Sequence, residues 1–241
     1  MPDYDRRLVD LYDEDNPDGP DHDFYRSLAD EIGARSIIDL GCGTGLLTVT
    51  LAHGGRTVVG VDPSPNMIDF ARGREHASAV EWVLGDSSCL PAESADLAVM
   101  TGNVAQHIDD ASWPEVLRHL RRALRSGGKL AFESRNPATR AWESWSSPER
   151  STRETAHGTL VEWSEVEEAG PGVVELVFHN QFIDADETVV ENLTLRFRSR
   201  GDLERALSDA GFSVDAVYGD WNRGPCRESS QIMVFVASAR R

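Results

Sequence analysis

The sequence predicts an α/β fold, a sheet covered by helices on both faces, with a small antiparallel β insert in its second half. Short apolar strands alternate with helical segments through residue 136. A loop with glycine at every second position, Gly41-Cys42-Gly43-Thr44-Gly45, follows the first apolar strand. From about Pro137 to Phe197, strand patterns follow one another without helices between them. Together these observations predict one α/β unit with a β appendage.

In the first half, each predicted element has its own signal. Apolar residues recur at helical spacing before the first strand, and Ser64 with Pro65 is a typical helix start. Ser112 and Glu115 form the pattern of a capping box, and Gly127-Gly128 is expected to end the helix that follows. The predicted strands cover 37–40, 57–62, 80–84, 96–100 and 129–133, and the helix after the glycine loop covers 46–51.

The second half begins with three predicted strands, over 160–166, 173–183 and 189–197, which form an antiparallel insert. In the middle strand, Val174, Leu176, Phe178 and Phe182 share one face by period-two spacing. The α/β pattern then resumes with a helix capped by Ser199 and strands over 212–218 and 231–237.

Composition limits the functional classes. The chain of 241 residues is 40% hydrophobic, which favours one sizeable core with an appendage. Its 24 basic and 41 acidic residues give a net charge of −17, which repels nucleic acid. Three cysteines without a pairing pattern and the lack of a long apolar run predict a cytoplasmic protein without a membrane partner. The seven histidines are scattered singly, so no metal site is expected.

The glycine loop and Asp62, which ends the next strand, predict a nucleoside site. Glycines let the backbone pass close beneath a ligand, and a carboxylate after the second strand accepts hydrogen bonds from ribose hydroxyls. A dinucleotide fingerprint would place its third glycine at position 46, where this chain has Leu46. This spacing argues against a pyrophosphate ligand.

These residues resemble the class I S-adenosylmethionine-dependent methyltransferases, in which an acid, here Asp39, precedes the Gly-x-Gly-x-Gly loop. The resemblance implies a Rossmann-like, mostly parallel seven-stranded sheet whose last strand is antiparallel and lies between the fifth and sixth. It also implies S-adenosylmethionine as cofactor and S-adenosylhomocysteine as product, with Asp62 on the ribose and Asp86 on the adenine amino group. The cofactor-binding residues that it implies are Asp39, Gly41, Cys42, Gly43, Gly45, Asp62, Pro63, Met67, Asp86, Ser87 and Asn103.

Two of these residues have a second interpretation. Met67 either contacts adenine or belongs to the core, as methionine on a helix face often does. Cys42 is expected to place its backbone near the cofactor and not to act as a nucleophile.

The N-terminal segment also allows two interpretations. Residues 1–23 carry nine acids and two arginines, a composition typical of a disordered tail. Tyr4 and Tyr12 instead suit a lid that folds over the cofactor, and Tyr12 is a candidate substrate contact.

Candidate acceptor residues follow the fourth and fifth strands, whose carboxyl ends face the ligand crevice. His107 is the candidate catalytic base; otherwise it is a surface or helix-capping histidine. Asn103 and Gln106 are expected to orient cofactor or acceptor. Arg135 and Asn136 could bind an acceptor carboxylate, although Arg135 could equally pair with a nearby acid.

The predicted function is transfer of a methyl group from S-adenosylmethionine to a nitrogen or oxygen of a small molecule, with nitrogen slightly favoured. The alternatives are a non-catalytic regulatory or binding protein of the same fold and, less favoured because of Leu46, a nicotinamide-dependent oxidoreductase. A monomer or homodimer is expected. The predicted division is a lid or helical segment at 1–35, the cofactor-binding core at 36–136, the insert covering the acceptor site at 137–198, and the rest of the core at 199–241.

Overall fold

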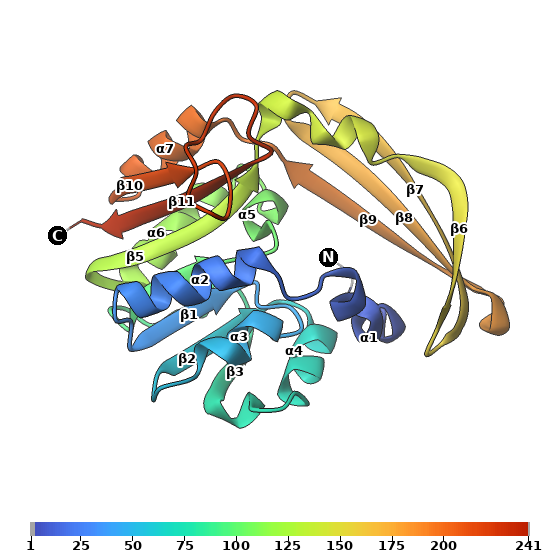
Figure 1. Ribbon diagram of the computed structural model, residues 1–241, viewed down its shortest axis with the longest axis horizontal. Helices are drawn as coiled ribbons and strands as arrows, with labels where there is room; N and C mark the ends of the chain where they lie inside the picture. The colour runs from blue at the N-terminus through green and yellow to red at the C-terminus, as the bar shows by residue number, and fades with distance from the viewer. Residues whose placement is uncertain (1–2, 241) are drawn as a thin grey trace.

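The computed structural model describes residues 3–240, which form two sheets and seven α-helices (Figure 1). The larger sheet contains β1 (Ser36–Leu40), β2 (Thr57–Asp62), β3 (Val80–Leu84), β4 (Ala95–Met100), β5 (Leu124–Arg135), β10 (Phe212–Tyr218) and β11 (Ile232–Ala239). The insert sheet contains β6 (Ser147–Thr155), β7 (Gly158–Gly170), β8 (Val173–Phe182) and β9 (Glu187–Arg196). The helices are α1 (Arg6–Asp15), α2 (Pro20–Glu31), α3 (Leu46–Leu51), α4 (Pro65–Arg72), α5 (Val104–His107), α6 (Trp113–Ala123) and α7 (Arg200–Asp209). Residues 1, 2 and 241, which fall in the predicted terminal segments, lie outside the described residues.

The larger sheet has the order β10-β11-β5-β4-β1-β2-β3, and β11 runs antiparallel to both of its neighbours, β5 and β10. The pairs among β1 to β5 are parallel. This confirms the predicted fold class, including the place of the last strand. The strand order reverses between β1 and β4, so a crevice forms at the carboxyl ends of these strands, where open α/β sheets bind ligands.

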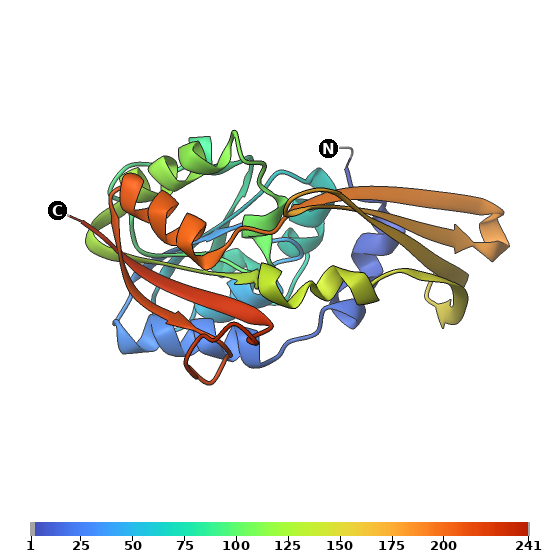
Figure 2. The same ribbon diagram turned by 90° about the horizontal axis from the view of Figure 1, so that it is seen from above.

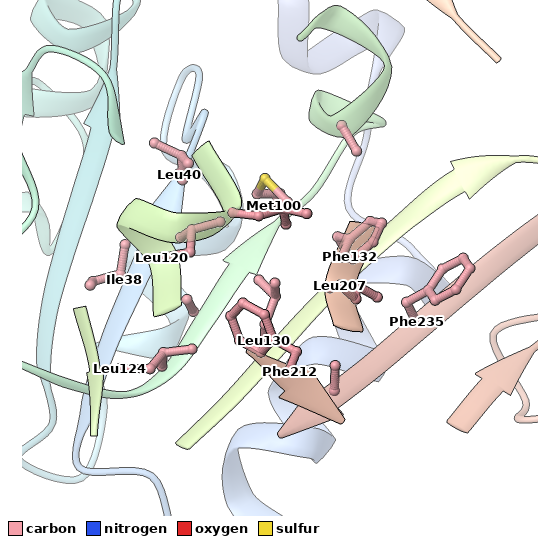
Figure 3. Close-up of a cluster of buried hydrophobic side chains, with 14 of the residues drawn as sticks. Ile38, Leu40, Met100, Leu120, Leu124, Leu130, Phe132, Leu207, Phe212 and Phe235 are labelled. Atoms are coloured by element: carbon pink, nitrogen blue, oxygen red, sulfur yellow. The ribbon is translucent and has the colours of Figure 1, made fainter. Parts of the chain in front are cut away.

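Side chains alternate between the two faces of the sheet and meet helices on each. On one face, Ile37 packs in a cluster with residues of α2 and α3. On the other, Ile38 and Leu40 belong to a cluster with residues of α5, α6 and α7. Figure 3 shows part of this second cluster, in which the Phe132 and Phe235 rings stack with their centroids 5.1 Å apart. Among residues 3–240, no helix is long and apolar enough to cross a bilayer.

The insert has four strands, so the predicted number of three is wrong. The missed strand, β6, has the sequence Ser-Pro-Glu-Arg-Ser-Thr-Arg-Glu-Thr and lies at the sheet edge with most of its residues exposed. An edge strand with two wet faces shows no alternation of apolar residues, which explains why the pattern did not reveal it. The antiparallel pairing and the buried face of β8, with Val174 and Phe182 fully buried, are as predicted.

The two ends of α6 also differ from the prediction. The Ser112 hydroxyl does not cap this helix. The Asp109 carboxylate instead holds the turn that precedes the helix, where it accepts the backbone N–H groups of Ala111 and Ser112 at 2.9 and 2.8 Å. The helix ends at Ala123, before Gly127, and β5 begins at Leu124, five residues earlier than the expected position 129.

The N-terminal segment is ordered, so the disordered-tail alternative is wrong for residues 3–23. Asp5 caps α1 by accepting the N–H of Arg7, and Leu11 of α1 packs with Leu160 and Phe182 of the insert. Figure 1 and Figure 2 show α1 in the angle between the core and the insert sheet.

Any side chain at position 45 is expected to destabilise the fold, because it would collide with Trp82. Gly45 has φ +79°, and a Cβ there would lie 2.5 Å from the Trp82 ring. We expect Gly45→Ala to lower the free energy of unfolding by about 3 kcal/mol, since overpacking adds to backbone strain. Gly54, with φ +66° and open space around it, is the matched control and should lose only about 1 kcal/mol as Gly54→Ala. Urea denaturation measures both, and equal losses would contradict the packing explanation.

Candidate active site

A cavity of about 710 Å³ opens at the carboxyl ends of β1, β2, β3 and β4. Its wall combines the loops after these strands with parts of α1, α4 and α6. Nine of the predicted site residues line it: Tyr12, Gly41, Gly43, Asp62, Pro63, Met67, Asp86, Ser87 and His107. The others, Asp39, Cys42, Gly45, Asn103, Gln106, Arg135 and Asn136, lie behind or beside this wall.

The three glycines of the loop have different roles. A Cβ on Gly43, at φ +54°, would meet nothing within 4 Å, because the cavity lies there. A Cβ on Gly41 would collide with the Val104 side chain at 2.4 Å, so this glycine lets the start of α5 pack closely. Gly45 packs against Trp82, away from the cavity. Only the first two glycines therefore shape the ligand space.

Asp62, at the end of β2, is only 8% exposed. One carboxylate oxygen accepts the Gly43 N–H at 2.9 Å, and the other accepts the Ser64 N–H at 2.9 Å. Burial raises the pKa of this carboxyl, although both hydrogen bonds oppose the shift. The acid thus fixes the glycine loop and the start of α4 while facing the cavity.

Asp39 lies beneath the loop and is 1% exposed. Thr48 donates to one of its carboxylate oxygens at 2.7 Å, and the other oxygen is buried without a partner in the described chain. Burial raises the pKa of Asp39 to about 6. An unpartnered buried oxygen is costly unless a ligand supplies the missing donor.

Met67, Asp86 and Ser87 line a further part of the cavity wall. Met67 of α4 is buried in the fold and also lines the cavity, so it serves as core and as wall. Asp86 is exposed there and accepts the Ser88 N–H at 2.8 Å, and hydrogen bonds from Ser88 lower the pKa of its carboxyl. Ser87 forms a hydrogen bond with His119 Nδ1 at 3.0 Å.

Helix α1 and the residues before it roof the cavity with Tyr4 and Tyr12. Asp3 accepts the Ser64 hydroxyl at the start of α4 at 2.5 Å. Asp13 accepts the hydroxyl of Thr44, in the glycine loop, at 2.6 Å and forms an ion pair with Arg74. The roof is thus tied to the same loop that Asp62 holds.

His107, at the end of α5, lines the cavity. Burial lowers the pKa of its imidazole, and the nearby Arg135 guanidinium lowers it further. A neutral imidazole at pH 7 is able to accept a proton. Its cavity position leaves the role of base open as a prediction.

The other predicted acceptor-binding residues, Gln106, Arg135 and Asn136, make contacts within the protein. The Gln106 carbonyl oxygen accepts both the backbone N–H and the guanidinium of Arg135, which lies over the Trp145 ring at 4.8 Å. The Asn136 amide donates to backbone carbonyls of residues 227, 228 and 230, and its oxygen accepts the Ala138 N–H. With these atoms engaged, Asn136 has no free group for an acceptor carboxylate, and the proposed role for it is not supported.

Asn103 stands behind the cavity wall in a left-handed conformation, φ +62°. Its N–H donates to Glu133 of β5 at 2.5 Å, and the Tyr25 hydroxyl donates to the same carboxylate. Glu133 is 2% exposed, and burial raises its pKa to about 7. This buried acid therefore fixes the loop whose neighbours Gly102 and Val104 line the cavity.

Sequence reasoning missed part of the wall. Ser112, Glu115, Val116 and His119 of the α6 region line the cavity. Their spacing of three, four and seven residues is that of one helix face, which was a usable signal.

Part of the chain is similar in sequence to known methyltransferases. Residues 37–128 match a family described as "Methyltransferase domain". The chain is 34% identical over 119 residues to the biotin biosynthesis bifunctional protein BioHC of Cellvibrio japonicus, a match that covers 47% of this chain and 23% of BioHC. The chain therefore spans about a quarter of the length of this relative.

Two solved structures share the architecture over nearly the full chain. The CcbJ methyltransferase of Streptomyces caelestis has a TM-score of 0.78 at 22% identity, covering 99% of this chain and 100% of the other. The sugar N-methyltransferase KedS8 of Streptoalloteichus has a TM-score of 0.75 at 22% identity, covering 100% and 96%. The predicted methyltransferase resemblance is confirmed at the level of the domain over residues 37–128. The predicted fold is confirmed over nearly the full chain.

Glu133 makes stability depend on pH. Its pKa of about 7 in the folded chain lies above the ordinary 4.5, so between these values the folded state holds a proton that the unfolded state releases. We therefore expect this contribution to be fully present below pH 4.5 and to disappear as the pH rises through 7. Relative to Glu133→Gln, the wild-type free energy of unfolding should fall across this window. Urea denaturation at several pH values measures it, and a constant difference would refute the assignment.

Proposed function

Because residues 37–128 form a methyltransferase domain of the class I S-adenosylmethionine-dependent fold, we propose that the whole chain is an enzyme that methylates a small molecule. The observation that carries this proposal is the cavity itself, where a buried carboxylate, Asp62, and the bare glycine backbone at Gly43 form one wall.

The residues present fit S-adenosylmethionine. Asp62 would accept from the ribose hydroxyls, and Asp86 with Met67 would hold the adenine. One carboxylate oxygen of Asp39 has no donor in the described chain. This acid would therefore suit the ammonium group of the methionine part of the cofactor. When bound, the cofactor supplies an electrophilic methyl group on a sulfonium. An anionic wall of this kind also favours a positively charged ligand.

The chain's own contribution is alignment and exclusion of water. The roof formed by Tyr4 and Tyr12 covers the cavity from the side of the insert. Holding two reactants near contact in a closed site lowers the barrier by several kcal/mol without a covalent step. Tyr12 and His107 line the same cavity and are the groups that we assign to the acceptor.

The acceptor atom is a nitrogen or an oxygen, with nitrogen favoured. A neutral amine attacks without a base, whereas a hydroxyl benefits from one, and His107, with its lowered pKa, could take that proton. The structural neighbour KedS8 is described as a sugar N-methyltransferase, which supports a nitrogen acceptor for this chain. The net charge of −17 supports a small molecule over nucleic acid.

Asp62→Asn tests the cofactor site. Replacing the carboxylate removes charge-assisted hydrogen bonds to the ribose, so we expect S-adenosylhomocysteine to bind about tenfold more weakly or worse. Isothermal titration calorimetry gives the affinity. Glu81→Gln, an exposed charge change on β3, is the matched control and should bind like wild type. Unchanged affinity of Asp62→Asn would remove this acid from the site.

Asp13→Ala tests the roof. The change breaks the contacts of α1 with Thr44 and Arg74, so α1 should open more often and release ligand sooner. We expect the dissociation rate of S-adenosylhomocysteine to rise about threefold to tenfold in stopped-flow measurements. Glu14→Ala, an exposed neighbour on the same helix, should leave that rate unchanged. If both variants release ligand at the wild-type rate, α1 is not a lid.

A further inference from the structure

The insert sheet presents one face to α1 and the cavity roof. Residues paired directly across neighbouring antiparallel strands share a face, which places Ser164, Phe178 and Glu191 side by side on this inner face. Both ends of the face are apolar. Val174 and Leu176 pack with Trp142 at one end, and Phe182 packs with Leu11 of α1 at the other. Between these ends, Phe178 lies among the polar side chains of Ser164, Asn180 and Glu191.

Glu191 differs from the other carboxylates of this inner face. Glu162 pairs with Arg153 at 2.9 Å, Glu168 with Arg140 at 2.6 Å, and Glu187 with Arg7 at 2.9 Å. Within residues 3–240, no lysine, arginine or histidine forms an ion pair with Glu191. Its side chain is nevertheless half-buried, and burial together with the nearby Asp5 raises the pKa of its carboxyl. A carboxylate in this setting lacks the cation that each of its neighbours has.

Asn180 orients this carboxylate and adds a second free acceptor. Its side chain is only 6% exposed, and its amide nitrogen donates to one oxygen of Glu191 at 3.3 Å. The amide oxygen of Asn180 and the second oxygen of Glu191 accept no hydrogen bond from the described part of the chain. Two acceptors without donors therefore lie next to each other on the inner face.

The groups around Glu191 and Asn180 favour a positively charged ligand. Tyr4 and Tyr12, which roof the cavity, lie close enough to Glu191 for its charge to raise the pKa of both phenols, after burial as the main cause. Asp62 acts on both phenols in the same sense from the cofactor side. An anionic or acceptor-rich ligand would be repelled here, whereas a group with several N–H donors and a positive charge would satisfy both acceptors.

We propose that Glu191 and Asn180 form a subsite that binds a protonated amino group of the acceptor molecule. This proposal rests on the proposed function and narrows its substrate class to amine-bearing small molecules. A nitrogen held as an ammonium has no lone pair, so this amino group is an anchor and the methylated atom is a different one. The charge of Glu191 acts on the phenols of Tyr4 and Tyr12, and aromatic rings of this kind suit a cation.

The experiment uses the full chain saturated with S-adenosylhomocysteine and two probes that differ in one group, 1-aminobutane and 1-butanol. Side-chain amide signals in nitrogen-edited NMR spectra report binding at Asn180, identified by their loss in Asn180→Asp. We expect a saturable shift of the Asn180 amide with 1-aminobutane and none with 1-butanol. Glu191→Gln, which keeps shape and removes charge, should weaken amine binding about tenfold or more.

Glu175→Gln is the matched control, because it removes one charge from the outer face of β8, where Glu175 is exposed. It should bind 1-aminobutane like wild type. Equal binding by Glu191→Gln and wild type, an equal response to 1-butanol, or no shift at Asn180 would each overturn the subsite. Calorimetry with S-adenosylhomocysteine runs in parallel. Failure of that binding would count against the proposed function, whereas intact binding without an amine response counts against the subsite alone.

Discussion

The architecture of the cavity depends on one buried carboxylate that has to be satisfied by backbone N–H groups. Asp62 stands at the carboxyl end of β2, almost fully buried, and accepts from Gly43 and Ser64. Those two donors belong to the glycine loop and to the start of α4, so a single side chain sets the position of both. Since Gly43 needs a positive φ to turn its N–H toward this acid, the loop sequence and the acid form one unit.

A second layer of acids ties the roof to that unit. Asp3 holds the start of α4 and Asp13 holds Thr44 of the glycine loop, while Arg7 and Arg153 join the α1 region to the insert through Glu187 and Asp15. Exposed ion pairs contribute little singly. Here several act on one short helix whose apolar side, at Leu11, is already buried against the insert. The acidic side chains of the N-terminal segment thus link α1 to both sheets, in addition to forming a solvated surface.

Elements that depend on local sequence rules could be predicted from the sequence. Features that depend on contacts between segments far apart in the chain could not. Strand β2, the cap at Ser64 and the place of β11 follow from periodicity, capping chemistry and family resemblance. Strand β6 escaped because an exposed edge strand has no apolar period. Asn136 was misjudged, since its partners lie some ninety residues away in the chain. Glu191 was invisible for the same reason, because only sheet register brings it beside Asn180 and the cavity roof.

We propose that this carboxyl edge of the sheet holds an adenosine through Asp62 and leaves the reactive end of the cofactor facing Tyr12 and His107. A crystal structure of the chain with S-adenosylhomocysteine tests it most directly. We expect both ribose hydroxyls to lie on Asp62, the adenine beside Met67 and Asp86, and the sulfur toward the space beneath Tyr12. A cavity that stays empty at saturating ligand, or a ligand bound elsewhere with Asp62 uninvolved, would contradict it.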